Sequence, residues 1–183
     1  MADALAAKIA LKMSGSLVRE LSGGDKTTLI VNELLSLILS EGTTANKANE
    51  WLNREAFTIT SGASENIDLY DLASLDIGAG AGKDALGRSW VGAELVCLII
   101  RNRAASAGTL LVGALAATTA FNSIFTGTDP DDAGLVLPPG AFMMIGNAAD
   151  PAYAIADTAN HLLKLAASGG NVTGDMWICA RNA

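Results

Sequence analysis

Charged and aromatic side chains are both scarce in this chain of 183 residues. Charged residues make up 17% of the sequence and aromatic residues 5%, whereas hydrophobic residues make up 50%. The few charges are mostly acidic, with 12 Lys and Arg against 19 Asp and Glu and a net charge of −7. Nucleic acids and anionic membranes both attract basic surfaces. We therefore expect neither a nucleic-acid nor a membrane partner, and the high hydrophobic content excludes an intrinsically disordered chain.

Long hydrophobic runs are missing as well. A helix that spans a bilayer needs roughly 20 consecutive apolar residues, and the longest apolar stretches are much shorter. These stretches are Leu34–Leu39, Leu95–Ile100 and Leu110–Ala117. Near the start, Asp3 stands where a signal peptide has cations, and Lys8 and Lys12 interrupt the apolar region. The sequence predicts a chain that is made in the cytoplasm and has no transmembrane segment.

A glycine-rich stretch from Gly78 to Asp84 superficially resembles a phosphate-binding loop. Such a loop has four residues between its glycines, followed by Lys and a hydroxyl residue that holds magnesium. Here Gly78 and Gly82 enclose three residues, and a carboxylate, Asp84, replaces the hydroxyl. We interpret the stretch as a loop between strands, and we predict no bound cofactor.

Metal and catalytic motifs are equally weak. The acidic segment 129–132 lacks the further oxygen ligands of a calcium loop, since Ala133 stands at one of their positions, so it is read as a turn. His161 is the single histidine, and one histidine without ligands at suitable spacing does not make a zinc site. We expect it on the exposed face of a strand. The sequence thus predicts no catalytic residue and no metal site, and the chain is not expected to be an enzyme.

Only two cysteines are present, Cys97 and Cys179, and each lies within an apolar run. This placement favours buried free thiols. A disulfide between two neighbouring strands remains an alternative, because sequence does not supply the required geometry.

Short apolar or alternating runs, separated by Gly, Asn, Asp and Pro, dominate the rest of the chain. Turn signals at such even spacing favour antiparallel strands in a sandwich or barrel. We predict an all-β, jelly-roll-like antiparallel β-sandwich over residues 26–183, preceded by an extended N-terminal arm over residues 1–25. Residues 91–100 are the best candidate for a central strand that is buried on both faces. The other expected strands are 57–60, 67–72, 109–112, 120–125, 134–137, 142–145, 153–155, 162–165 and 172–179.

The segment 28–40 is ambiguous. It fits one amphipathic helix capped by Thr27 or Thr28, and it equally fits two strands with Leu35, Leu37 and Leu39 on one face. Strands are favoured because the sequence continues through Gly42-Thr-Thr, as in a hairpin.

Several segments, in this order, carry a resemblance to a known group of proteins. They are Gly42–Trp51, Phe57–Leu69, Leu98–Asn102, Thr109–Gly113, Ala120-Phe121, Val136–Ile145 with its Pro138-Pro139-Gly140 turn, Asp150–Ile155, Leu162–Ala166 and Gly169–Ile178. Together they resemble a family of small all-β virion structural proteins of tailed bacteriophages, encoded among head and tail morphogenesis genes. The N-terminal 40 residues and Met143-Met144 depart from that pattern.

The resemblance implies a capsid decoration or cement protein on the virion surface, which would bridge and stabilise subunits of the major capsid protein. A homotrimer is the expected assembly, since a capsid offers threefold sites. Apolar residues of the arm are the expected contacts with the shell or with neighbours: Leu5, Ile9, Leu11 and Leu17.

Two other functions remain open. The chain could be a tail, collar or adaptor component of the virion. It could also be a carbohydrate-binding sandwich used in host adsorption, for which Trp51 would be the exposed aromatic platform, whereas Trp90 and Trp177 lie far away in the sequence.

Overall fold

The structure, a computed structural model, is built from β-strands. It describes residues 6–20, 26–78, 80–84, 87–113, 119–121, 123–125 and 134–182. Within these ranges there is no helix, and hence none that could cross a membrane. The strands are β1 (Ala6–Glu20), β2 (Lys26–Glu41), β3 (Lys47–Ala48), β4 (Glu50–Ile59), β5 (Ser64–Asp68), β6 (Glu94–Asn102), β7 (Thr109–Gly113), β8 (Gly134–Leu137), β9 (Phe142–Gly146), β10 (Tyr153–Ala154), β11 (Leu162–Ser168) and β12 (Val172–Arg181).

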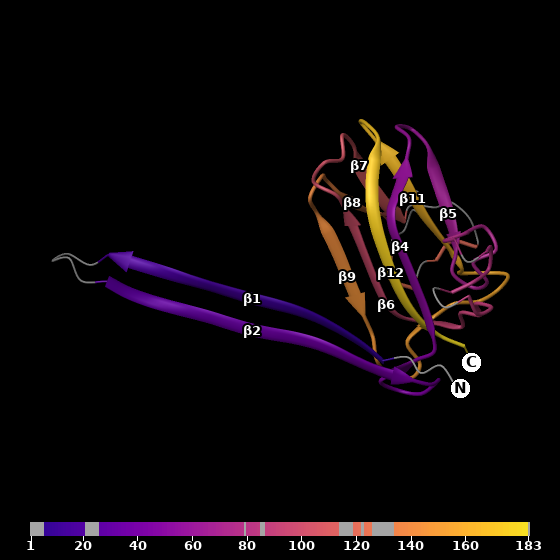
Figure 1. The fold of residues 1–183 in the computed structure, drawn as a ribbon, viewed down its shortest axis with the longest axis horizontal. Helices are drawn as coiled ribbons and strands as arrows, with labels where there is room; N and C mark the ends of the chain where they lie inside the picture. The colour runs from indigo at the N-terminus through magenta and orange to yellow at the C-terminus, as the bar shows by residue number, and fades with distance from the viewer. Residues whose placement is uncertain are drawn as a thin grey trace.

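Two antiparallel sheets pack together to form the body of the molecule (Figure 1). One sheet has the order β10-β6-β12-β4, with β9 also paired to β6, and the other has the order β5-β11-β7-β8. The predicted all-β sandwich is therefore confirmed. The predicted central position is confirmed as well, because β6 pairs with β12 on one side and with β9 and β10 on the other. Burial on both faces is not confirmed, since Ile99 on the outer face is only partly buried.

The core lies between the two sheets. Successive side chains of a strand point to opposite faces, and the inward positions are apolar, such as Leu98 and Ile178 in one sheet and Leu163 and Leu165 in the other, all fully buried. Asn102 connects the sheets at the end of β6: its buried side-chain amide donates to the carbonyls of Gly108 and Leu137, at 3.0 and 2.9 Å.

The glycine-rich stretch is part of the connection between β5 and β6, as predicted. A carboxylate oxygen of Asp76 accepts hydrogen bonds from the backbone amides of Gly78 and Gly80. Asp84 is fully buried and pairs with Arg88 at 2.7 Å. The carboxylate that spoils the phosphate-loop pattern thus has a structural partner within the loop.

Two other sequence predictions concern His161 and the acidic turn 129–132. His161 was expected on an exposed strand face, but this prediction is wrong: His161 precedes β11, is only 8% exposed, and its Nδ1 lies 3.1 Å from the carbonyl of Ala156. It is buried because β11 pairs with β5, which brings Asp68 to 3.8 Å from Nε2. The acidic turn 129–132 lies outside the described residues.

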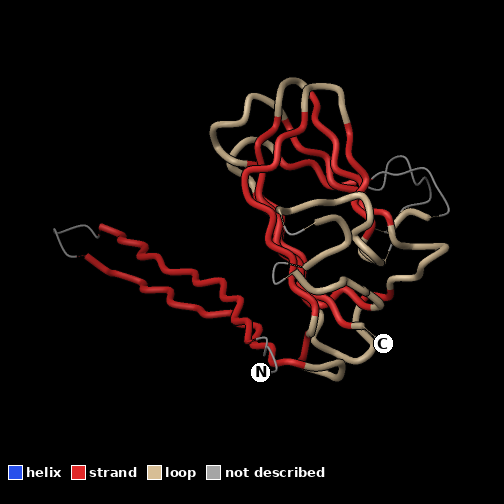
Figure 2. The backbone as a smooth tube through the Cα atoms, turned by 45° about the vertical axis from the view of Figure 1, so that its right-hand side comes forward, coloured by secondary structure: helices blue, strands red, loops and turns tan. Residues whose placement is uncertain are grey.

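A long two-stranded ribbon projects from one end of the body (Figures 1 and 2). It consists of β1 and β2, paired antiparallel from Ala6 opposite Ser40 to Glu20 opposite Lys26. The ambiguous segment 28–40 is thus neither a helix nor two strands but part of one strand. Residues 6–20 of the predicted arm form one half of the ribbon, and residues 26–41 form the other. At about 3.4 Å per residue, the ribbon is about 50 Å long.

Candidate functional site: the ribbon, its root and the outer sheet face

The residues of the ribbon divide into two unlike faces. Directly opposed residues of an antiparallel pair share a face, and each strand alternates with period two. The register places Ile9 opposite Leu37 and Leu11 opposite Leu35, so the odd-numbered positions of both strands form one face. We call this the odd face. Its apolar members are Ala7, Ile9, Leu11, Met13, Leu17, Leu29, Val31, Leu35, Leu37 and Leu39.

The even-numbered positions are mixed in character. Lysine, serine and asparagine alternate there with apolar residues, and Ala10 opposite Ser36 is one example of an exposed pair on this face. Three of the predicted contact residues, Ile9, Leu11 and Leu17, fall together on the odd face, while Leu5 lies outside the described residues. The ribbon is therefore amphipathic, with an apolar face that is interrupted by Gly15 and Glu33 and ends at the polar pair Arg19 and Thr27.

At its root the odd face packs against the body. Leu39 is 2% exposed and belongs to a small second core with Ala48, Val96, Cys97 and Cys179, on which Leu37 also packs. Ile38, on the opposite face, is 64% exposed. A Cβ atom added to Gly146 would lie 3.2 Å from Cδ2 of Leu37, so the absence of a side chain there allows the ribbon to approach β9.

Arg181, at the end of β12, fastens the root. Its side chain is almost completely buried and forms an ion pair with Glu94 at 2.6 Å. It also donates to the carbonyl of Thr44 at 2.7 Å, in the loop that follows β2, and to the carbonyl of Ala149. One guanidinium thus joins the ribbon's connection to two segments of the body.

Arg88 and Glu50 form a second polar group at the root. Arg88 lies 2.7 Å from Asp84 and 3.9 Å from Glu41, the last residue of β2, and it donates to the carbonyl of Asn49. Glu50 is 5% exposed. Burial raises the pKa of Glu50 to about 7, against the opposing effect of Arg88 and with further increases from Asp84 and Glu41. The base of the ribbon therefore contains a carboxyl group that holds its proton near neutral pH.

The two cysteines meet beneath the root. Cys97 on β6 stands directly opposite Cys179 on β12, and both thiols are buried and free, as predicted. Burial raises the pKa of Cys97 to about 12 and also raises that of Cys179. Because the thiolate is the reactive species, these cysteines contribute packing rather than nucleophiles.

The body's sheet continues beyond the root as a partly uncovered apolar surface. The register aligns Gly146, Cys97 and Cys179 in the row under the root, and the next row along the same face contains Met144, Ile99 and Trp177. These three side chains are only partly buried, and Phe142, one row further, is 56% exposed. We call Phe142, Met144, Ile99 and Trp177 the outer patch.

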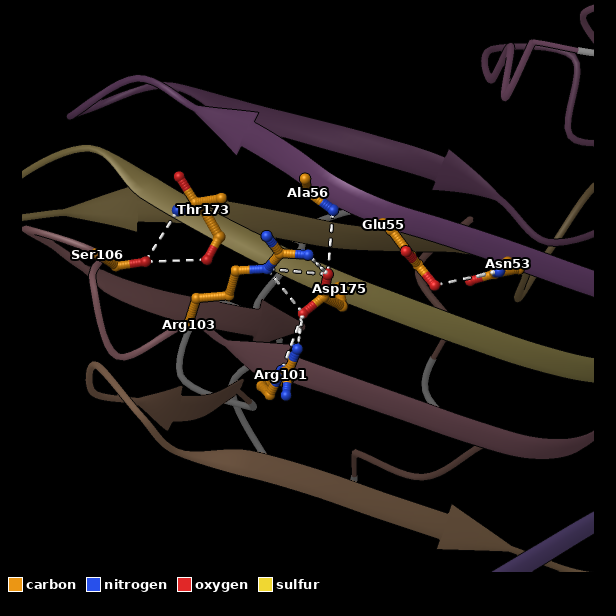
Figure 3. A network of polar contacts seen from close by, with 8 residues as sticks. All are labelled: Asn53, Glu55, Ala56, Arg101, Arg103, Ser106, Thr173 and Asp175. Carbon is orange, nitrogen blue, oxygen red and sulfur yellow. Dashed lines mark hydrogen bonds and ion pairs between the residues drawn. The ribbon is translucent and has the colours of Figure 1, made fainter.

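A network of charges is centred on Asp175 (Figure 3). Asp175 on β12 is fully buried and pairs with Arg101 at 2.6 Å and with Arg103. It also accepts a hydrogen bond from the backbone amide of Ala56. The Arg103 hydrogen bond, opposed by burial and helped by Ala56 and Arg101, holds the pKa of Asp175 well below its usual range. The Arg101 guanidinium lies 6.0 Å from the ring centroid of Trp177, and so links the network to the patch.

The tryptophans are distributed differently from the expectation. Trp51, expected to be the exposed one, is half-buried against the second core, and Trp90 is 2% exposed. Trp51 pairs with Cys179, two residues from Trp177, so both rings belong to the outer sheet face. Sequence separation concealed this, because β4 and β12 are distant in the chain but adjacent in the sheet.

Among the described residues, no three His, Cys, Asp or Glu side chains are grouped so that they could hold a metal ion. What the described residues bring together is a ribbon with one apolar face, a buried polar root and an apolar sheet face. Comparison with protein-family models, with curated proteins and with solved structures gave no match.

Proposed function

We propose that this chain is a non-enzymatic structural protein of a phage virion, a capsid decoration or cement protein that bridges and stabilises major capsid subunits. The observation that carries the proposal is the amphipathic ribbon of β1 and β2. An isolated two-stranded ribbon is at best marginally stable in water, and this one presents about ten apolar residues along one face. Such a surface is suited to permanent burial against protein.

The dimensions of the ribbon fit a bridging role. A compact body of about 140 residues has a radius of gyration of about 14 Å, and hence a diameter of about 37 Å. A ribbon of about 50 Å reaches past the edge of such a body and onto adjacent subunits. Repeated over a shell, many such contacts would add by avidity.

The polar clusters of the described residues also favour a mechanical role. Asp175 joins three strands, Arg181 joins the ribbon's root to the body, and Asn102 joins the two sheets. Each cluster ties segments of the fold together, which would help a shell component to resist mechanical stress. We accordingly propose a virion location, self-association as a homotrimer and the major capsid protein as partner.

Immunogold labelling of intact virions, with an antibody against this chain, tests the proposal. Label spread over the head is the expected result. Label confined to the neck or tail would replace the cement function by an adaptor function, and virions without label would overturn both.

A functional readout completes the test. Capsids assembled without the chain should lose their genomes at lower temperature, and adding back the purified chain should restore the original temperature. If its presence does not change capsid stability, the cement function is wrong even where the head is labelled.

A further inference from the structure

We infer that the odd face of the ribbon packs on the outer patch of a second copy of this chain, so that copies are joined by exchanged ribbons. The inference rests on the proposed function only in requiring that copies of the chain associate. It names the two surfaces through which they would do so.

Continuity with an existing contact is the first argument. The sheet face formed by β9, β6 and β12 already binds the odd face of its own ribbon at the root, where Leu37 and Leu39 cover the row of Cys97 and Cys179. The next row, Met144, Ile99 and Trp177, offers the same kind of apolar surface on the same strands. Beyond its root the ribbon points away from the body (Figures 1 and 2).

The ribbon's long edges are largely unpaired within the described residues, and the outer patch is only partly buried. Along its outer edge β1 pairs with no other described strand, and β2 has a second partner only at Ser40 and Glu41, where it meets β3. The exposed fraction of Phe142 reaches 56% at the far end of the outer patch. One chain carries both an apolar ribbon face and an apolar sheet face. In an assembly of identical copies, the ribbon of one copy can therefore bury its apolar face on the sheet of another.

The area beyond the root falls within the range of specific interfaces. About ten residues of each strand lie beyond the pair Ile9 and Leu37, so one face about 34 Å long and about 10 Å wide covers about 340 Å². A copy that gives one ribbon and receives another would bury about 680 Å² of its own surface, or about 1,400 Å² counted over both copies, against the roughly 1,200–2,000 Å² of a standard interface.

The charges of the ribbon lie mainly on its other face. Lys8 and Lys12 occupy even-numbered positions, so the charged residues at odd-numbered positions of β1, and of β2 as far as Leu39, are Arg19 and Glu33. The face that would enter the contact therefore carries no net charge and is suited to an apolar surface.

The first experiment compares matched ribbon variants of the full chain by sedimentation and light scattering. Leu11→Glu with Leu35→Glu places two carboxylates on the odd face, and Ala10→Glu with Ser36→Glu places the same charges on the neighbouring pair of the even face. We expect the first pair to weaken association about 100-fold, because it would bury charge in an apolar contact. The second pair should leave association unchanged. Equal effects of the two pairs, or a wild-type chain that is monomeric, would overturn the inference.

The second experiment tests the acceptor surface. Phe142→Glu with Met144→Glu alters the outer patch, and Leu135→Glu with Val136→Glu alters exposed apolar positions of β8, in the other sheet. Only the first variant should dissociate the oligomer. If it does not, the ribbon binds elsewhere and the inference fails.

Mixing the two defective chains then separates ribbon exchange from simple ribbon-on-ribbon contact. The Leu11→Glu, Leu35→Glu chain keeps an intact outer patch, and the Phe142→Glu, Met144→Glu chain keeps an intact ribbon. The mixture should form a heterodimer with one intact contact, although neither chain associates alone. A mixture that stays monomeric contradicts the proposed pairing.

A photo-crosslinking residue at position 35 provides a measurement that does not depend on how the glutamate variants fold. In a mixture of isotopically light and heavy chains, crosslinks between chains should map to residues 142–146 or to neighbouring positions of β6 and β12. Crosslinks between chains that map only to the partner's ribbon would overturn the inference. An oligomer that is insensitive to every variant, or a monomer found on virion heads, would leave the cement function standing while this inference fails.

Discussion

At the scale of single residues, the structure depends on buried charges whose partners come from distant parts of the chain. Asp175 is the clearest case, since Arg101, Arg103 and the Ala56 amide all converge on one carboxylate (Figure 3). Removing one partner of a buried charged group leaves the others unsatisfied. The stability of the sandwich should therefore be unusually sensitive at this position.

Asp175→Asn should lower the free energy of unfolding at pH 7 by about 2–3 kcal/mol. Folding lowers the pKa of Asp175. The ionised carboxylate therefore stabilises the folded state at pH values above its unfolded-state pKa, and this stabilisation is lost as the pH falls through the acid range. Urea denaturation at pH 7 and at pH 3 measures both effects, and the deficit of the variant should shrink at pH 3. Asp157→Asn, in an exposed turn, serves as the control and should change neither value.

The pKa of Glu50 changes in the opposite direction on folding. Its pKa rises from 4.5 to about 7 on folding, so the folded state binds the proton more tightly. Its contribution to stability is complete below pH 4.5 and is lost as pH rises through 7. Glu50→Gln should consequently be more stable than the wild type at pH 8, by about 1–3 kcal/mol, and nearly equal to it at pH 4. Denaturation curves at the two pH values check this, with the exposed Glu55→Gln as control; a Glu50→Gln variant less stable at pH 8 would contradict it.

Single-residue environments were only partly predictable from sequence. The buried free state of Cys97 and Cys179 followed from their apolar neighbours, but their direct opposition depends on the pairing of β6 with β12. The burial of His161 likewise depends on β5, which lies far away in the sequence. Partners brought by non-local strand pairing leave no local signal, and for that reason the Asp175 network was not anticipated.

At the scale of elements, the strands were easier to predict than the ribbon. Isolated apolar runs such as β6 stand out between turn residues, whereas β2 contains adjacent apolar pairs, Leu29-Ile30 and Leu34-Leu35, that obscure its period of two. The alternation of β1 and β2 becomes evident only when the register of the two strands is known. The apolar residues of the odd face can be seen in the sequence, but only the pairing of β1 with β2 shows that they share one face.

The root of the ribbon should control access to the thiols beneath it. Leu39→Ala removes a buried side chain from the small core that contains Cys97 and Cys179, at a cost of about 2–3 kcal/mol. If the substitution lowers the free energy of local opening of the root by this amount, the thiols should be labelled about 30-fold faster or more under native conditions. Ile38→Ala, on the exposed opposite face, should leave the labelling rate unchanged. Labelling at the same rate in both variants would mean that the root does not cover the thiols.

At the scale of the whole molecule, the chain separates a closed sandwich from an open ribbon. The sandwich buries most of its apolar side chains in one core to which both sheets contribute, and it leaves the outer patch partly exposed. Among the ribbon side chains that the structure describes, Leu37 and Leu39 are the ones that pack on the small second core. The composition predicted a large apolar surface and few charges. Only the three-dimensional structure shows how that surface is divided between an internal core and a projecting ribbon.

The attachment of the ribbon to β12 also sets an order of events during synthesis. About 130 residues separate the end of β2 from the start of β12, and at about 5–20 residues per second the ribosome needs on the order of ten seconds to make them. Throughout that interval the ribbon has left or is leaving the ribosome, while Arg181 and Cys179, which hold its root, do not yet exist. Ala48, Val96 and Cys97, which also pack at the root, are made earlier, but the root is complete only when the last strand of the sandwich is inserted. A nascent chain therefore lacks the complete root of the ribbon, and assembly through the ribbon would follow the folding of the body.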